Sequence, residues 1–169
     1  MDEVDTLIKA FGSRGKRHQS LWKLDVLLDL GRLNDPRVVQ LLVTVVTDAD
    51  EPLDVRLDVL GSFREMSLTP GDRNRVAGAC LAALAPASDS RIRLRAAIVL
   101  GDFVDNERVL DALGTVAAEC ESTELRYNAY TSLQRAGPTI ACVDMLRLLC
   151  ADKAFGPSAR ALLASWGVA

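Results

Sequence analysis

Histidine, aromatic residues and long apolar runs are all scarce in this sequence. His18 is its only histidine, and aromatic residues make up 5% of the 169 residues. A lone histidine beside a basic loop is more typical of a surface position than of a general base, and so few aromatic residues leave little material for stacking nucleic-acid bases or enclosing a chromophore. The longest stretch without a charged residue, 76–88, is shorter than the roughly 18 to 20 apolar residues of a membrane-spanning helix, so we expect no such helix.

The sequence also lacks a metal-binding or redox motif. Its four cysteines, which show no C-x-x-C spacing and have no histidine nearby, are Cys80, Cys120, Cys142 and Cys150. Their apolar surroundings indicate small, buried hydrophobic side chains. The first residues, MDEVDT, are acidic and do not resemble an export signal. We therefore expect a reducing, cytoplasmic location, with no disulfides, metal ions or cofactors.

Composition and charge predict one globular domain that is not built to bind phosphate. Hydrophobic residues make up 49% of the chain and charged residues 25%, which is the balance of a packed soluble protein. A chain of this length suits one compact domain, so we expect a single domain over residues 1–169. The formal net charge of −3 and the isoelectric point of about 5.2 argue against a surface that neutralises nucleic-acid phosphates.

Apolar residues recur at steps of three and four along almost the whole chain, which predicts helices. One such stripe consists of Ile92, Ala96, Val99, Leu100 and Phe103. The β-branched run VVQLLVTVVT competes as a strand, but Pro36 before it suits the first turn of a helix that follows Asp35. Short breakers such as Asn-Asp-Pro and Gly-Pro divide the chain into about ten helices of roughly 10 to 15 residues. The predicted fold class is all-α.

A repeat is aligned by one large apolar residue near the end of every second helix. The marker residues are Leu30, Leu60, Leu100, Leu133 and Trp166. They are spaced 30, 40, 33 and 33 residues apart, and the long interval contains an insertion between Phe63 and Arg75. The repeat predicts helix pairs in five units. The approximate units are 1–33, 34–68, 69–104, 105–136 and 137–169.

The segments LGRLNDPRVVQLL, DSRIRLRAAIVLGDF and ESTELRYNAYTSL resemble a known repeat family. They are similar to the HEAT-like repeats first recognised in phycobilisome lyases, which read approximately LG-x-x-x-D-P-x-x-V-x-x-L and then D-x-x-V-R-x-x-A-x-x-x-L-G. In this chain Lys23 stands at the place of Arg93, and Arg56 lies three residues closer to Leu60 than the pattern requires. The resemblance implies a short right-handed α-solenoid of about five antiparallel HEAT-like helix pairs. It does not imply lyase activity, because such repeats occur in many unrelated roles.

Two arginines occupy the same position in successive units. Arg93 and Arg126 each lie seven residues before a marker leucine, and each follows an acid by a few residues, Asp89 in one unit and Glu121 in the next. In HEAT-like families the turn acid and the helix arginine form a ladder that runs from unit to unit. The resemblance therefore implies a structural role for these four residues, and a repeated position is also what a stacked scaffold requires.

A stripe of polar residues on the second helices is predicted to face solvent. Arg91 and Arg95 lie one turn apart on a helix that begins near Ser90, and with Asp102 they lie opposite its apolar stripe. The candidate partner-binding residues are Arg91, Arg95, Asp102, Tyr127, Asn128 and Arg135. The second helix of such a pair usually lines the concave side, where a groove of mixed charge suits a protein or peptide better than a phosphate backbone. A solvated face without a partner is the alternative interpretation.

Arg14, Lys16 and Arg17 form the only dense basic cluster, within the segment FGSRGKRH. The glycines of this segment are too close together for a phosphate-binding loop, and no serine or threonine follows Lys16. We interpret the segment as a flexible turn between the first two helices. Contact with an anionic partner or a nucleic acid is the alternative.

These patterns favour a non-catalytic protein-binding module that acts as an adaptor, regulator or inhibitor through the groove of the second helices. Two other classes stay open. One is a bilin-lyase type or lyase-associated protein, which only the resemblance implies, and the other is a nucleic-acid-binding helical-repeat protein, which normally has a basic concave face. Because no second histidine, serine elbow or paired inward carboxylates are evident, we expect no enzymatic activity. The expected partner is a protein or peptide, and neither a nucleic acid nor a membrane.

Overall fold

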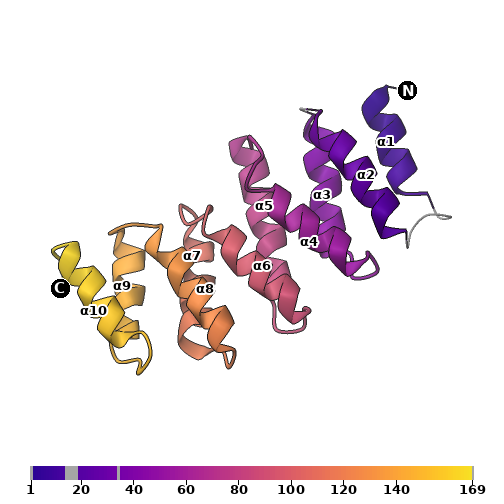
Figure 1. Cartoon of the computed structure of the whole chain (residues 1–169). Coiled ribbons are helices and arrows are strands. Elements are labelled where there is room, and N and C mark those ends of the chain that lie inside the picture. Colours follow the sequence, from indigo (N-terminus) through magenta and orange to yellow (C-terminus); the bar gives the residue numbers. More distant parts are fainter. Residues whose placement is uncertain (1, 14–18, 34, 169) are drawn as a thin grey trace. The chain divides into compact units, whose positions relative to one another are not determined.

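The computed structural model describes residues 2–13, 19–33 and 35–168, and these residues form ten α-helices and no β-strand (Figure 1). In chain order the helices are α1 (Glu3–Phe11), α2 (Ser20–Gly31), α3 (Pro36–Thr47), α4 (Leu53–Ser62), α5 (Pro70–Ala83), α6 (Ser90–Leu100), α7 (Glu107–Glu119), α8 (Thr123–Gln134), α9 (Ile140–Leu149) and α10 (Gly156–Ser165). The all-α prediction is confirmed for this part of the chain. None of these helices combines the length and the apolar character that crossing a membrane requires.

Local sequence signals set the ends of the helices. α3 begins at Pro36, and the side chain of Asp35 caps it by accepting a hydrogen bond of 2.8 Å from the backbone N–H of Arg37. Thr69 caps α5 through its hydroxyl oxygen in the same way. The prediction that the VVQLLVTVVT run is helical is therefore confirmed. α6 begins at Ser90, where the alternating arginines predicted a helix.

The helices pack into two compact units, Met1–Arg95 and Ala96–Ala169, and the boundary between the units lies within α6. In the first unit α1 contacts α2 and α3, α3 contacts α4 and α5, and α2 contacts α4. In the second unit α7 contacts α8 and α9, and α9 contacts α10. Contacts within each unit thus join neighbouring helices and helices two places apart.

The marker leucines lie in the cores of these units. Leu30, Leu60, Leu100 and Leu133 are fully buried, whereas Trp166 is half-buried. The small residues Ala96, Ala97 and Ala129 are fully buried as well. Side chains of this size allow helix axes to approach closely where they cross.

Arginines near the start of a second helix hold the end of the first helix. Arg56, Arg93 and Arg126 each donate a hydrogen bond from Nε to a backbone carbonyl nine or ten residues earlier. The accepting carbonyls belong to Val46, Leu84 and Ala117, at 3.1, 3.2 and 2.7 Å. These carbonyls lie in the last turns of α3 and α7 and at the C-cap of α5, where an α-helix has no donor of its own to offer. A guanidinium there also lies at the negative end of the helix dipole, so the repeated arginine stabilises the helix pair.

The contact of Arg56 supports a different alignment of the second repeat unit, residues 34–68. Arg56 makes the same contact as the arginines of the later units, which lie seven residues before their marker leucine. The residue seven after Arg56 is Phe63, which is buried, so Phe63 and not Leu60 aligns with Leu100. The interval is then 37 residues and not 40. The Leu-Gly dipeptide misled the alignment, because a Cβ at Gly61 would meet no atom within 4 Å and packing does not require glycine there.

Gly101, in contrast, marks a close approach of two chain segments in the second unit. A Cβ at Gly101 would lie only 2.8 Å from Oγ of Ser132. Ser132 is buried in α8, and its hydroxyl donates a hydrogen bond of 2.9 Å to the carbonyl of Ala97. This bond satisfies a buried hydroxyl, which would otherwise be costly. Glycine is therefore needed here to admit the serine.

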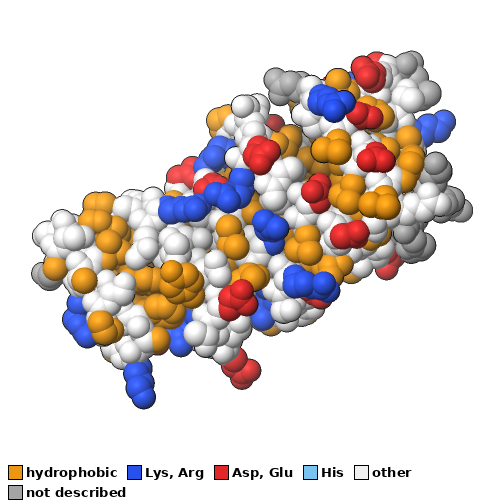
Figure 2. Space-filling model, viewed as in Figure 1, with side chains coloured by type: hydrophobic (Ala, Val, Ile, Leu, Met, Phe, Trp, Pro, Cys, Tyr) orange, Lys and Arg blue, Asp and Glu red, His pale blue; other side chains and the backbone are white. Residues whose placement is uncertain are grey.

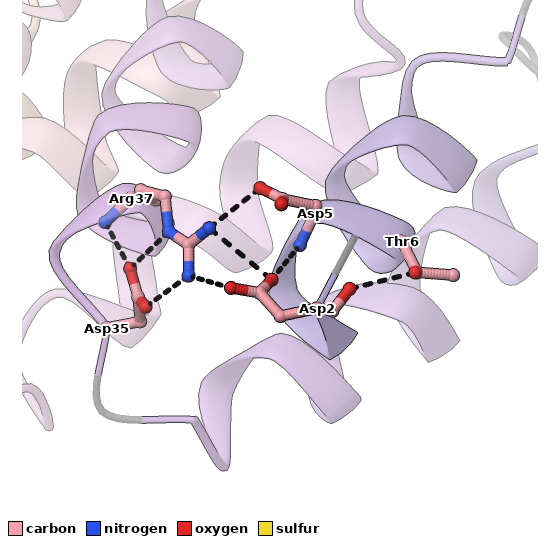
Figure 3. Close-up of polar contacts among 5 residues, drawn as sticks. All are labelled: Asp2, Asp5, Thr6, Asp35 and Arg37. Carbon is pink, nitrogen blue, oxygen red and sulfur yellow. Dashed lines mark hydrogen bonds and ion pairs between the residues drawn. The ribbon is translucent and has the colours of Figure 1, made fainter.

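One arginine ties the start of α3 to the start of α1. The guanidinium of Arg37 donates to three carboxylates, those of Asp2, Asp5 and Asp35, at 2.8, 2.7 and 2.7 Å (Figure 3). Hydrogen bonds from the Arg37 side chain and backbone lower the pKa of Asp35 from 3.8 to about 2, and the Arg37 side chain also lowers the pKa of Asp2. Because the cluster reaches solvent, we expect its contribution to be modest and weakened by salt.

Candidate binding surface

The two arginines predicted to face solvent on α6 are both exposed. Arg91 keeps 66% of its side chain exposed while its Nε lies 3.3 Å from the carboxylate of Asp89. Asp89 also accepts a hydrogen bond of 2.9 Å from the backbone N–H of Arg91, and the side-chain and backbone bonds from Arg91 together lower the pKa of Asp89. Arg95 lies one turn further along the helix. The carboxylate of Asp89 therefore accepts hydrogen bonds from both the side chain and the backbone of Arg91, in the first turn of α6.

In the second unit, Asp102 and Arg135 form an ion pair. Nη1 of Arg135 donates to the carboxylate of Asp102 at 2.7 Å, and both side chains are partly exposed. The side-chain amide of Asn128 donates a hydrogen bond of 2.9 Å to the carbonyl of Glu124 within the same helix. Tyr127, also on α8, is 61% exposed. The structure thus leaves the large aromatic side chain of Tyr127 exposed, while Asp102 and Arg135 of the same unit are paired with each other.

Arg126 connects α8 to the turn that precedes α10. Its Nη2 donates to the carboxylate of Asp152 while its Nε holds the Ala117 carbonyl, and its Cζ lies 5.0 Å from the ring centroid of Phe155. Hydrogen bonds from the backbone N–H of Phe155 and from the Arg126 guanidinium lower the pKa of Asp152. The acid in this connection is therefore Asp152. The ladder role of Glu121, which is exposed, stays a prediction.

Lys23 makes the corresponding connection in the first unit. Its Nζ pairs with the carboxylate of Glu51, in the turn that precedes α4, and lies 4.3 Å from the ring centroid of Phe11. The side chain of Lys23 is 1% exposed and that of Glu51 is 10% exposed. A cation buried to this degree is tolerated only when its charge is paired. Each unit therefore contains a cation, a carboxylate and a phenylalanine ring at the start of a second helix.

Large apolar side chains are exposed at positions that sequence reasoning missed. Leu21 and Leu28 of α2 are 81% and 64% exposed, and Ile140 and Leu148 of α9 are 84% and 71% exposed. A signal was available for α2, because its sequence SLWKLDVLLDLG carries more leucine than one buried stripe needs. The aspartates among these leucines, such as Asp25, looked like an ordinary solvated face.

Two of the four cysteines, Cys80 and Cys142, are buried as predicted, whereas Cys120 and Cys150 are half-buried. Cys80 and Cys142 are fully buried free thiols, and burial raises the pKa of Cys80 to about 12 and that of Cys142 to about 11. Thiols that stay protonated and shielded at neutral pH are poor nucleophiles. Among the residues that the structure describes, no group of three or more histidine, cysteine, aspartate or glutamate side chains is arranged to hold a metal ion.

The basic cluster of Arg14, Lys16 and Arg17 lies outside the described residues. No protein-family model matches this chain, and no curated protein gives a significant match. Because these comparisons assign no family, the candidate binding surfaces among the described residues are the exposed faces of α2, α4, α6 and α8.

Proposed function

We propose that this chain is a non-catalytic protein-binding module, an adaptor, regulatory or inhibitory protein that presents a rigid helical surface to its partner. Its helices would form HEAT-like antiparallel pairs in a right-handed solenoid, as the sequence resemblance implies. The contacts between helices two places apart and the repeated arginine support this arrangement. A surface that is rigid before binding loses little conformational entropy when the partner docks.

The observation that carries the proposal is the exposure of large apolar side chains, three of which lie on second helices and two on α9. Leu21 and Leu28 on α2 and Tyr127 on α8 are all more than 60% exposed. Removing such a side chain from water contributes about 1.5–3 kcal/mol. Tyrosine is also enriched at the energetic centres of interfaces. Arg135 and Asp102 lie on the same unit as Tyr127 and provide polar groups for an interface rim.

Comparative affinity purification from the native host tests the proposal. The tagged wild-type chain is expected to recover a partner in stoichiometric amounts, and Tyr127→Ala and the Arg91→Glu/Arg95→Glu variant should each recover about one tenth of it or less. Arg108→Glu, an exposed arginine on the first helix α7, is the matched control and should recover the wild-type amount. Circular dichroism verifies folding of every variant. Equal recovery by all four proteins would show that the exposed residues of α6 and α8 do not carry the interface.

A further inference from the structure

We propose that α2 and α4 form a docking surface for a basic amphipathic helix of a partner protein. The surface, called here the α2–α4 face, consists of Leu21, Asp25 and Leu28 of α2 with Asp54 and Asp58 of α4. This inference rests on the proposed function of the chain as a protein-binding module. It adds the chemistry of the segment that one surface of the first unit receives.

The apolar part of the α2–α4 face is a row along α2. Leu21, Asp25 and Leu28 lie at positions i, i+4 and i+7, so they share one side of the helix. The two leucines are 81% and 64% exposed, and the half-buried Leu24 lies between them at i+3. Single exposed leucines are ordinary on protein surfaces, whereas a contiguous exposed row marks an interaction site.

The acidic part of the α2–α4 face lies on α4, which packs beside α2 (Figure 1). The hydroxyl of Ser20 donates a hydrogen bond of 2.9 Å to the carboxylate of Asp54, so the two helices start side by side. Asp58 is exposed one turn after Asp54. Figure 2 shows hydrophobic and acidic side chains intermingled over these two helices. The leucine row therefore lies alongside exposed carboxylates.

The cations of α2 and α4 are directed elsewhere. Each helix contains one, Lys23 in α2 and Arg56 in α4. Lys23 is buried with Glu51, and Arg56 donates to the Val46 carbonyl at the end of α3. The exposed charge on the two helices is consequently negative. An apolar row bordered by negative charge is complementary to a segment whose leucine-like side chains are bordered by lysine or arginine.

The spacing of the leucines favours a helical occupant. Leu21 and Leu28 lie about 10.5 Å apart along the helix axis at 1.5 Å per residue. A partner helix with apolar residues at i, i+3 or i+4 and i+7 matches this distance, which is the usual mode of helix recognition by a hydrophobic surface. Lysine or arginine on its flanks would face Asp25 on α2 and Asp54 and Asp58 on α4. Negative potential at the surface also repels phosphates and anionic lipid headgroups.

A second copy of the chain is a weaker candidate for the occupant. The other described helix with two large exposed apolar side chains is α9, which carries Ile140 and Leu148. α9 is not basic, because its arginine, Arg147, pairs with Asp144 at 3.3 Å. The helix that docks on the α2–α4 face is therefore expected to come from a different protein.

Titration of the full chain with a synthetic peptide tests this inference. The probe is a fluorescent amphipathic helix with leucine on one face and lysine and arginine on the other, and the control peptides have the same composition in scrambled order or glutamate at every basic position. We expect the probe to bind the wild-type chain saturably with micromolar affinity, and the control peptides not to bind. Leu21→Ala/Leu28→Ala should weaken it about tenfold or more, and Asp25→Asn/Asp54→Asn/Asp58→Asn should weaken it and reduce its dependence on salt.

Two matched variants control for unspecific attraction. Ile140→Ala/Leu148→Ala removes equally exposed apolar side chains from α9, and Glu107→Gln/Asp111→Asn/Glu119→Gln removes three exposed acids from α7. Both should bind the probe like the wild-type chain. Absence of saturable binding, or equal binding by the wild type and the α2–α4 variants, would overturn the inference.

Analytical ultracentrifugation of the same variants distinguishes a partner helix from a second copy of the chain on the α2–α4 face. Self-association of the wild-type chain that disappears in Leu21→Ala/Leu28→Ala would assign the α2–α4 face to a second copy and overturn the inference about a partner helix. The proposed function fails independently, when the wild-type chain recovers no partner or when Tyr127→Ala, Arg91→Glu/Arg95→Glu and Leu21→Ala/Leu28→Ala all recover every partner of the wild-type chain. Loss of partners in Tyr127→Ala or Arg91→Glu/Arg95→Glu without peptide binding would leave the protein-binding module in place and refute only the α2–α4 face.

Discussion

The two units hold a second helix by the same kind of contact but with different cations. In the first unit Lys23 forms an ion pair with one partner, Glu51, and its ammonium group lies over the ring of Phe11. In the second unit Arg126 serves both Asp152 and the Ala117 carbonyl, because its planar guanidinium presents several donors in fixed directions. The lysine connection is correspondingly more deeply buried, at 1% exposure against 20% for the arginine.

The two units also differ in the side chains that they expose to solvent. On the second unit Arg135 pairs with Asp102, and the large exposed apolar side chains are Tyr127 of α8 and Ile140 and Leu148 of α9. On the first unit the cations of α2 and α4 point inward, so the α2–α4 face keeps leucines beside negative charge. The comparison shows that similar connections between a cation and a carboxylate inside the two units are combined with different exposed side chains outside.

Removing Glu51 should break the first unit's connection with the largest effect. Glu51→Ala leaves the charge of Lys23 buried without its partner, which costs about 3–5 kcal/mol of unfolding free energy. Urea unfolding is followed by Trp22 fluorescence in a Trp166→Phe background, since each unit contains one tryptophan. Adding Lys23→Met should restore most of the loss. A double variant as unstable as Glu51→Ala would contradict this explanation.

Gly101→Ala should destabilise the second unit by about 1–3 kcal/mol, because its Cβ would lie 2.8 Å from Oγ of Ser132. Gly78→Ala in α5 of the first unit is the matched control, as a Cβ there meets no atom within 4 Å. Helix propensity predicts that this control is stabilised by about 0.5–1 kcal/mol. The urea midpoint of Gly101→Ala is followed by Trp166 and that of Gly78→Ala by Trp22, and the first should fall while the second rises. A loss of stability in both variants would refute the packing argument.

Arg126→Lys should reveal what the guanidinium adds in the second unit. Lysine keeps the charge but cannot hold the Ala117 carbonyl and the Asp152 carboxylate together, so we expect a loss of about 1–2 kcal/mol. Arg32→Lys is the control, since Arg32 is 78% exposed and its replacement should change stability by less than about 0.5 kcal/mol. Urea unfolding followed by Trp166 fluorescence in a Trp22→Phe background measures Arg126→Lys, and Trp22 fluorescence in a Trp166→Phe background measures the control. Equal stability of Arg126→Lys and wild type would show that the two cations are interchangeable.

The smallest effect concerns the exposed Arg37 cluster of the first unit. Because the folded pKa of Asp35 is depressed to about 2 from 3.8, its contribution is fully present above about pH 4 and is lost as the pH falls toward 2. The stability difference between the wild type and Arg37→Met should therefore shrink over this window. Urea midpoints at pH 7, 4 and 2.5 measure it. A difference that grows on acidification has the wrong sign for a carboxylate of lowered pKa.

Helix content was predictable from the sequence because its signals are local. Pro36 after Asp35 and the three-and-four spacing of apolar residues fix helix positions without reference to other segments. The alignment of the second repeat unit, residues 34–68, was not predictable from the sequence, because Leu60 followed by glycine resembles the other markers. The contact of Arg56 with the Val46 carbonyl, which supports Phe63 as the equivalent residue, depends on how two helices pack.

The candidate site was only partly accessible from the sequence. Exposure of Arg91 and Arg95 follows from helical spacing, but the pairing of Arg135 with Asp102 joins residues 33 positions apart. The exposure of Leu21 depends on which faces of α2 its neighbours cover. The composition of α2 alone therefore does not show that Leu21 is exposed.

Amide chemical-shift mapping locates a bound basic helix directly. The 15N-labelled chain is titrated with the amphipathic lysine and arginine peptide, and the shift changes are compared along the chain. The α2–α4 face predicts saturable changes that are largest in α2 and α4 and are abolished by Leu21→Ala/Leu28→Ala. Changes that are largest in α7 and α9, or that spread evenly without saturation, would contradict it.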